Sequence, residues 1–168
     1  MHLDHQHHLA YCTNIHPAES WAETLGVLQE HTLKVRDKVI RGDEPYAIGL
    51  RLSALAAREL MEEDNLPLFQ DWLSSQNCYV FTINGFPYGA FHGTRVKENV
   101  YLPDWSSTER LVYTNQLFNI ISRLAPEGVE GSVSTLPGSF KAFKADESSI
   151  FANLETCARH IEDLSEQT

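Results

Sequence analysis

The sequence lacks any cluster of basic residues. It contains 13 lysines and arginines against 23 aspartates and glutamates, so its formal net charge is −10. Such a chain repels a polyanion, because binding to nucleic acid depends on basic side chains that neutralise phosphates. The sequence therefore predicts that nucleic acid is not a partner.

Cysteine and long apolar runs are also scarce. The three cysteines, Cys12, Cys78 and Cys157, are far apart and show no CxxC spacing, which fits a reducing cytoplasm. No apolar run approaches the ~20 residues of a membrane-spanning helix. The N-terminal "MHLDHQHH" has neither the basic region nor the apolar core of a signal peptide. We expect a cytoplasmic protein with no membrane span.

Strand-like and helix-like segments alternate along the chain. Ser20 and Glu23 have the spacing of a capping box at a helix start, as do Ser106 and Glu109. Gly42 stands where the first helix should end. The pattern predicts four strands, each followed by helix, at residues 8–15, 46–53, 78–84 and 131–136. This order indicates a parallel sheet with right-handed crossovers.

Four such units fit two architectures. One is half of a (β/α)₈ barrel, which takes about 250 residues when complete. The other is a small open doubly wound sheet, although the first strand–helix junction has no GxGxxG phosphate loop. The third strand, "CYVFTIN", is apolar on both faces, as in a parallel strand covered on both sides. We expect the half barrel: a parallel (βα)₄ sheet in a single α/β domain over residues 1–168, with a flexible tail at 1–7.

Candidate site residues follow the predicted strands, because ligands of parallel sheets bind at the carboxyl ends of the strands. Asn14 lies at the end of the first predicted strand and His16 just past it, Asn84 ends the third and His92 lies beyond it, and Lys141 follows the fourth. All five are candidates for substrate binding, and His16 and His92 also for a metal ion. Each has a structural alternative, since asparagine can cap a strand end, histidine can tie a loop and lysine can simply be solvated.

The connection after the third strand is much the longest. It runs from Gly85 to Trp105 and is rich in aromatic residues. Connections above ~15 residues without structure are usually functional or disordered, and the aromatic content argues against disorder. We expect this loop to fold over the mouth of the sheet or to form a short hairpin.

Four histidines near the N-terminus form a second candidate metal cluster. They lack acidic or cysteine partners at fixed spacing beyond Asp4, so a flexible tail is the simpler interpretation. These residues are His2, His5, His7 and His8.

Three segments carry a family resemblance: "HLAYCTNIHPAESWAETL", "NGFPYGAFHG" and "STLPGSFK". Together they resemble the sugar-phosphate-isomerase-like family of the bacterial Ebo metabolite-traffic cluster. The first segment of that family usually reads close to "YCTNIHPGESW", so Ala18 replaces a common glycine. The similarity runs from His8 to about Phe143.

The resemblance implies a xylose-isomerase-like barrel that handles a secondary-metabolite precursor. It implies a small sugar-like or cyclitol-like ligand, other Ebo-cluster proteins as partners, and a divalent metal held in the wider superfamily by residues of later strands. Family members are about twice as long as this chain, which therefore corresponds to their N-terminal half. His16, Asn84 and His92 are the early-strand positions that would assist binding.

Three functions stay open at this level. The first is isomerase or epimerase catalysis, for which this half lacks a convincing carboxylate ligand set. The second is a non-catalytic binding or assembly component, and the third is an inactive remnant. A half barrel also leaves the edges of its first and last strands unpaired, so we expect association, such as a homodimer, or poor solubility.

Overall fold

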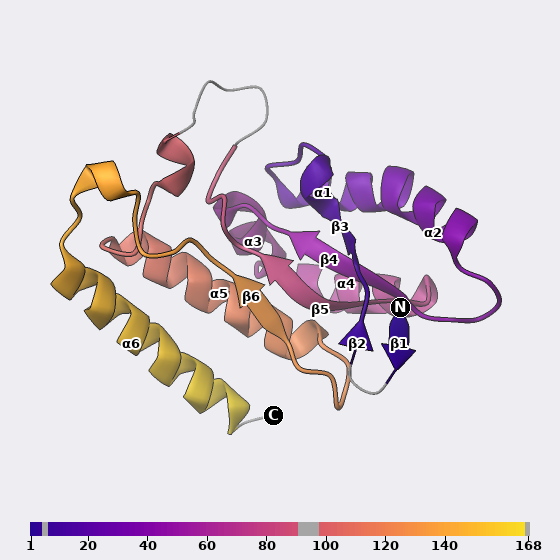
Figure 1. Ribbon diagram of the computed structural model, residues 1–168. Coiled ribbons are helices and arrows are strands. Elements are labelled where there is room, and N and C mark those ends of the chain that lie inside the picture. Colours follow the sequence, from indigo (N-terminus) through magenta and orange to yellow (C-terminus); the bar gives the residue numbers. More distant parts are fainter. Residues whose placement is uncertain (5–6, 91–97, 167–168) are drawn as a thin grey trace.

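The computed structural model describes residues 1–4, 7–90 and 98–166, and its centre is a parallel sheet (Figure 1). Four strands lie in the order β3–β4–β5–β6, which is also their order in the chain. All three neighbouring pairs are parallel. The strands are β3 (Tyr11–Cys12), β4 (Tyr46–Arg51), β5 (Cys78–Asn84) and β6 (Ser132–Ser134). The protein is thus an α/β fold, and the described strand order has no reversal of the kind that defines a doubly wound sheet.

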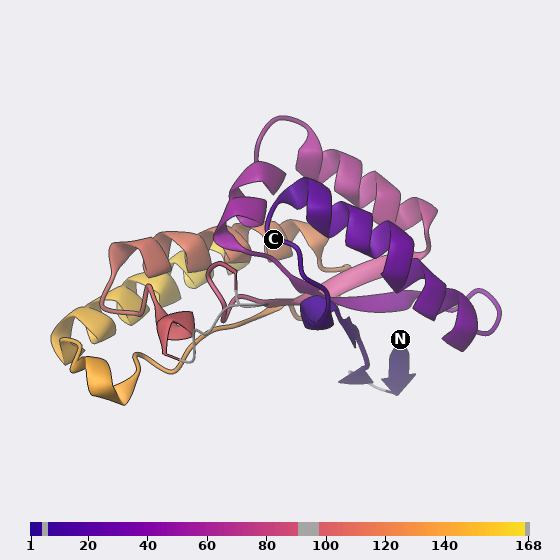
Figure 2. The ribbon, with the colours of Figure 1, turned by 90° about the horizontal axis from the view of Figure 1, so that it is seen from above.

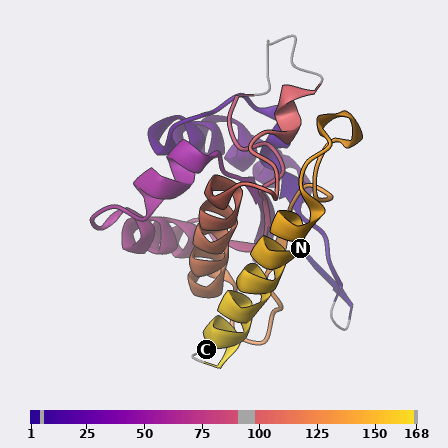
Figure 3. The same cartoon turned by 90° about the vertical axis from the view of Figure 1, so that its left-hand side faces the viewer.

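Helices follow each of these four strands, and those before α5 pack against one face of the sheet (Figure 2). The first helical stretch is α1 (Trp21–Val27), a π-helical segment (Leu28–Thr32) and α2 (Leu33–Val39). Next come α3 (Ala54–Leu60), α4 (Asn65–Ser75), α5 (Thr108–Leu124) and α6 (Glu147–Ser165). Figure 3 shows α6 lying alongside α5. Short 3₁₀ turns cover Thr13–Ile15, Asn99–Tyr101 and Lys141–Phe143.

The main core lies between the sheet and these helices. Alternate residues of β4 point into it, because successive side chains of a strand face opposite sides. In β5 a shift of register opposite Ile48 and Gly49 separates the inward-facing Val80 and Ile83 by three residues. The core's buried strand residues are Tyr46, Ile48, Leu50, Val80 and Ile83, and its buried helical residues include Leu28, Leu60, Phe69, Leu117 and Ile120. None of the helices in the described ranges is long and apolar enough to cross a membrane.

The opposite face of the sheet is only partly covered. Tyr79, Phe81 and Asn84 of β5 are only half-buried there. The composition of β5 predicts a strand covered on both sides, and the structure covers it fully on one side alone. The helices before α5 cover one face, and within the described ranges the secondary structure over the other face is a small hairpin of β1 (His2–Asp4) and β2 (His7–His8). His8 anchors this hairpin, since its Nδ1 lies 2.8 Å from the Tyr79 hydroxyl and its ring lies 5.2 Å from that of Phe81.

The hairpin occupies most of the predicted flexible tail. The Met1 ammonium donates to the Leu9 carbonyl at 2.8 Å, and the Leu9 amide donates back to the Met1 carbonyl at the same distance. These bonds extend the pairing of β1 with β2. The flexibility of residues 1–7 stays a prediction.

Local signals locate some boundaries and miss others. The capping box of Ser20 and Glu23 is confirmed, with both reciprocal hydrogen bonds present. The second predicted box is wrong by one residue: Ser107, not Ser106, caps α5. Ser106 instead donates its amide and its hydroxyl to the carboxylate of Asp104.

The outer strands are shorter than predicted. β3 ends at Cys12, where the sequence predicts strand to residue 15, because the chain turns into the 3₁₀ segment there. The Thr13 hydroxyl accepts a hydrogen bond of 2.8 Å from the Arg51 amide, a contact that an extended β3 would replace with a backbone one. β6 likewise covers only three of the six predicted residues.

Candidate functional site

The carboxyl ends of the strands form one edge of the sheet. The register pairs Arg51 with Asn84 and Asn84 with Ser134, so these residues lie in a row across β4, β5 and β6. The loops that leave this row contain most of the polar and aromatic side chains described below.

Arg51 organises the loops on one side of this edge. Its side chain is 2% exposed, and both terminal nitrogens lie 3.1 Å from Oε1 of Glu19. It also donates to the carbonyl of Gly89 at 2.8 Å and to that of Ala18. A buried guanidinium needs such partners, because an unpaired charge in the interior is strongly destabilising. Arg51 is therefore a structural group that joins the loops after β3 and β5 to the end of β4.

Arg110 plays the same part for the long loop after β5. It is fully buried on α5 and donates to the carbonyls of Gly85 at 2.8 Å, Phe86 at 3.2 Å and Pro103 at 2.8 Å. Burial lowers the pKa of its guanidinium, although that group remains charged in proteins. The two ends of the loop are thus held to one side chain.

Asp104 connects that loop to the one after β6. It is 4% exposed and accepts hydrogen bonds from the Ser106 amide at 3.0 Å, from the Ser106 hydroxyl at 2.5 Å and from the Ser139 hydroxyl. Burial by itself raises the pKa of this carboxyl. The hydrogen bonds from Ser106 and Ser139 outweigh that effect, so the net result is a pKa below the ordinary value. Asp104 is therefore an anion at neutral pH.

Four aromatic rings also bridge these two loops. The ring centroids of Phe86 and Tyr101 lie 5.4 Å apart, those of Tyr101 and Phe140 5.2 Å, and those of Phe140 and Phe143 5.3 Å. Such spacings are typical of favourable aromatic pairs. All four side chains are half-buried, so part of each ring faces solvent at the carboxyl end of the sheet.

A cavity of about 640 Å³ opens between the same loops. Its size falls within the range of small-molecule sites, roughly 300–1,000 Å³. Both apolar and polar groups line it: Tyr88, Leu102, Pro103, Phe143 and Ala145 are largely apolar, and Asp104, Ser106, Ser107 and Glu109 are polar. The Ser107 hydroxyl donates to the Glu109 carboxylate and is the main cause of its lowered pKa. Asp104 and Glu109 thus line the cavity as two anions.

The predicted residues occupy different places relative to this cavity. The side-chain oxygen of Asn84 accepts a hydrogen bond of 3.0 Å from the amide of Phe86, the first of the four aromatic residues above. Lys141 is exposed in the 3₁₀ turn that also contains Phe143. Asn14 is half-buried in the 3₁₀ turn after β3. His92 lies outside the described residues.

His16 lies against the helical layer instead. Its Nε2 is 2.8 Å from the Tyr11 hydroxyl, and its ring stacks on His31 with centroids 4.9 Å apart and planes 10° apart. His31 belongs to the π-helical segment that follows α1. Burial, and then the neighbouring His31, lower the pKa of His16. The structure therefore gives His16 contacts on the helix-covered side and none with Asn84 among those it describes.

The described residues do not fit a divalent metal site. Within the described ranges, no group of three or more histidines, cysteines, aspartates and glutamates is placed to hold an ion. The described neighbours of the His16 ring are the Tyr11 hydroxyl and the His31 ring, which together with His16 do not make a metal-ligand set. No chemical step through a metal can be derived from these residues.

Sequence reasoning missed the two buried arginines and Asp104. One signal could have found Arg110, which shares a helical face with Tyr113, Thr114 and Leu117 at spacings of three, four and seven residues. A charge within an apolar stripe is a residue that needs buried partners. Arg51 gave a weaker signal as the only charged residue of a buried strand.

No family model, no curated protein and no solved structure matches this chain. The resemblance to the Ebo-cluster family therefore stays a prediction.

Proposed function

We propose that this chain forms four strand–helix units of a xylose-isomerase-like (β/α)₈ barrel and binds a small sugar-like or cyclitol-like metabolite at the carboxyl end of its sheet. One observation carries the proposal. The cavity between the loops after β5 and β6 combines aromatic rings with carboxylates and hydroxyls. That is the mixture of surfaces a polyhydroxylated ring requires, because such a ligand has apolar C–H faces and a rim of hydroxyl donors and acceptors.

The barrel part of the proposal draws on the arrangement of the sheet. A (β/α)₈ barrel has parallel strands in chain order, helices outside and side chains filling the inside. The described sheet has the same strand order and its first helices on one face. The half-buried face corresponds to the inside of a barrel, and the β1–β2 hairpin lies over its amino-terminal end beside Tyr79.

The charges of the cavity favour an uncharged polyol over a phosphate ester. Asp104 and Glu109 both have lowered pKa values and are anionic at neutral pH. They accept hydrogen bonds from hydroxyls and repel a phosphate that enters beside them. Lys141, two residues before Phe143, and Lys144, directly after it, are exposed cations that a phosphate at the outer rim could meet.

Binding, rather than isomerisation or epimerisation, is the function that these residues support. Proton abstraction beside a carbonyl needs a positioned base and a group that polarises the oxygen. The described residues offer no metal-ligand set for the second task. Delivery of the metabolite to other Ebo-cluster proteins is the part of the proposal that rests on the sequence resemblance alone.

Ligand titrations test this proposal. Xylose, myo-inositol and their monophosphates are titrated against the full chain, with saturation-transfer NMR and calorimetry as readouts. We expect myo-inositol or xylose to bind and the matching phosphate to bind more weakly. Phe143→Ala should weaken binding about tenfold, the effect of losing ~1.4 kcal/mol of ring contact.

The matched control is Phe151→Ala. Phe151 is 68% exposed on α6 and does not line the cavity. Equal affinities of the two variants, or the failure of every probe to bind, overturn the proposal.

A further inference from the structure

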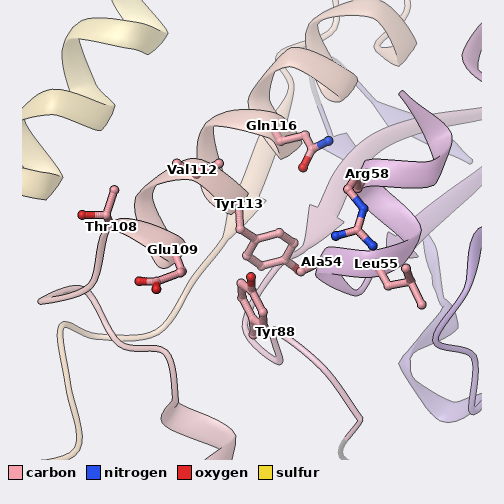
Figure 4. A pocket seen from close by; sticks show the side chains of 9 residues that line it. All are labelled: Ala54, Leu55, Arg58, Tyr88, Thr108, Glu109, Val112, Tyr113 and Gln116. Atoms are coloured by element: carbon pink, nitrogen blue, oxygen red, sulfur yellow. The ribbon is translucent and has the colours of Figure 1, made fainter. Parts of the chain in front are cut away.

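A second cavity lies between α3 and α5, on the helical side of the molecule (Figure 4). Its volume is about 540 Å³. It shares Tyr88 and Glu109 with the cavity described above, but its other walls differ. They are Ala54, Leu55 and Arg58 from α3, and Thr108, Val112, Tyr113 and Gln116 from α5.

Two tyrosine rings form its floor. Tyr88 and Tyr113 meet edge to face with ring centroids 5.1 Å apart. The buried Arg110 guanidinium lies behind them, 5.7 Å and 5.5 Å from the two centroids. The Tyr113 hydroxyl donates to the Leu52 carbonyl at 2.5 Å, and the Tyr88 carbonyl accepts from the Ala54 amide at 2.8 Å. The Tyr113 ring is thus held in place by its hydroxyl, while the Tyr88 hydroxyl points toward Tyr113 on the cavity side (Figure 4).

Opposite charges stand on the two walls. Figure 4 shows Arg58 reaching from α3 and Glu109 from the start of α5, on either side of the Tyr113 ring. Arg58 is exposed, and its side chain forms no ion pair or hydrogen bond with any described residue. Glu109 is held by the Ser107 hydroxyl and has a lowered pKa, so it is an anion there.

Apolar side chains at the rim are exposed as well. Val112 is 60% exposed and Leu55 is 38% exposed, on opposite sides of the cavity. Together with the tyrosine floor they leave an apolar slot between a cation and an anion. The volume suits a single-ring compound, since small-molecule sites span roughly 300–1,000 Å³.

We propose that this cavity binds a small zwitterion whose carboxylate and ammonium groups stand at opposite ends of an apolar ring. The carboxylate pairs with Arg58, the ring lies against Tyr88 and Tyr113, and the ammonium group faces Glu109. A compound with a second carboxylate in place of the ammonium group is rejected by Glu109. The site shares Tyr88 and Glu109 with the proposed metabolite cavity, but Arg58 and Tyr113 line only this one, so its occupancy can be tested by itself.

Three probes that differ only at one end test the proposal. They are 4-(aminomethyl)benzoate, benzoate and terephthalate, each titrated into the full chain with amide chemical shifts as the readout. The expected order of affinity is the zwitterion first, benzoate second and the dianion last. The largest shifts should fall on α3 and on the first turns of α5.

Charge-neutral variants separate the two walls. Arg58→Gln should weaken binding of both 4-(aminomethyl)benzoate and benzoate about tenfold, through the loss of one charge-assisted pair. Glu109→Gln should leave benzoate unchanged or slightly tighter and abolish the advantage of the zwitterion. The control is Arg41→Gln, which makes the same charge change at an exposed arginine outside this cavity.

The proposal is overturned if no probe binds, if terephthalate binds as tightly as the zwitterion, or if Arg58→Gln and Arg41→Gln behave alike. Phe143→Ala serves as a cross-check, because Phe143 lines only the metabolite cavity. It should leave 4-(aminomethyl)benzoate binding intact, so failure at one cavity is distinguishable from failure at the other.

Discussion

Arg51 and Glu19 are 32 residues apart in the chain and meet in an ion pair of 3.1 Å at the end of β4. The arginine is almost fully enclosed, while the carboxylate side chain is 35% exposed. The same guanidinium donates to the carbonyls of Ala18 and Gly89, so one side chain at the end of β4 holds together the loops that follow β3 and β5.

Replacing this arginine should therefore be costly. Arg51→Met leaves the Gly89 and Ala18 carbonyls without their donor and Glu19 without its partner. Breaking a buried pair costs about 3–5 kcal/mol, and the partial exposure of Glu19 places the expected loss at the low end, about 3 kcal/mol. Urea unfolding of the two proteins measures it.

Arg159→Met is the matched control for that prediction. Arg159 pairs with Glu155 at 2.5 Å one helical turn away on α6, but both side chains are largely exposed. Its loss should change the unfolding free energy by less than about 0.5 kcal/mol. Equal losses for the two variants would show that the Arg51 pair has no special role.

Tyr113 offers a second stability prediction. Its hydroxyl donates to the Leu52 carbonyl at 2.5 Å in a buried setting. Tyr113→Phe removes only the oxygen and leaves that carbonyl without its donor, which should cost about 1–2 kcal/mol. Tyr101→Phe is the control, because the Tyr101 hydroxyl bonds no described residue, and it should have almost no effect on the urea midpoint.

The stacked histidines predict a pH dependence. Burial, and then His31, lower the pKa of His16 below 6.5. The unfolded chain therefore takes up a proton at this position at a higher pH than the folded protein does. The contribution of His16 to stability is complete above about pH 6.5 and declines as the pH falls from there toward the folded pKa.

NMR titration of the His16 ring measures this directly. His31→Gln removes the second cause of the shift, so the pKa of His16 should move upward, toward 6.5, without reaching it, since burial remains. The pH dependence of the unfolding free energy should become shallower in the same variant. An unchanged His16 pKa in His31→Gln would refute the role of the stacked pair.

The open edges of the sheet predict self-association. Among the described strands, β3 pairs only with β4 and β6 only with β5, so each has one unpaired side. Unpaired strand edges are templates for pairing with another chain. Sedimentation velocity over a wide concentration range should show association, and Ser134→Lys, which places a charge on exposed β6, should reduce it. A stable monomer at every concentration is the contrary result.

Local sequence signals predicted the alternation of elements well. The third strand has the predicted bounds of 78–84, and the box of Ser20 and Glu23 begins α1. Both depend on residues within a few positions of one another, so periodicity and capping chemistry suffice to place them. Shorter strands at the edge of the sheet were overestimated because their ends are decided by contacts such as that of Thr13 with Arg51.

The contacts of the candidate site were beyond such reasoning. Asn84 and Lys141 were predicted at the carboxyl end of the sheet, because strand order alone places them there. The packing of loops and helices far apart in the chain decides the other contacts. It stacks His16 on His31, and it places Phe140 between Tyr101 and Phe143.

The sequence by itself determined the order of strands and helices in this protein, since apolar spacing and capping residues act over one or two turns. Only the tertiary structure decided which polar side chains are buried supports and which face a cavity. Arg51 and Arg110 stabilise the loops because their guanidinium groups donate hydrogen bonds to loop carbonyls. Arg58, equally charged, lies beside an open slot and remains available to a ligand.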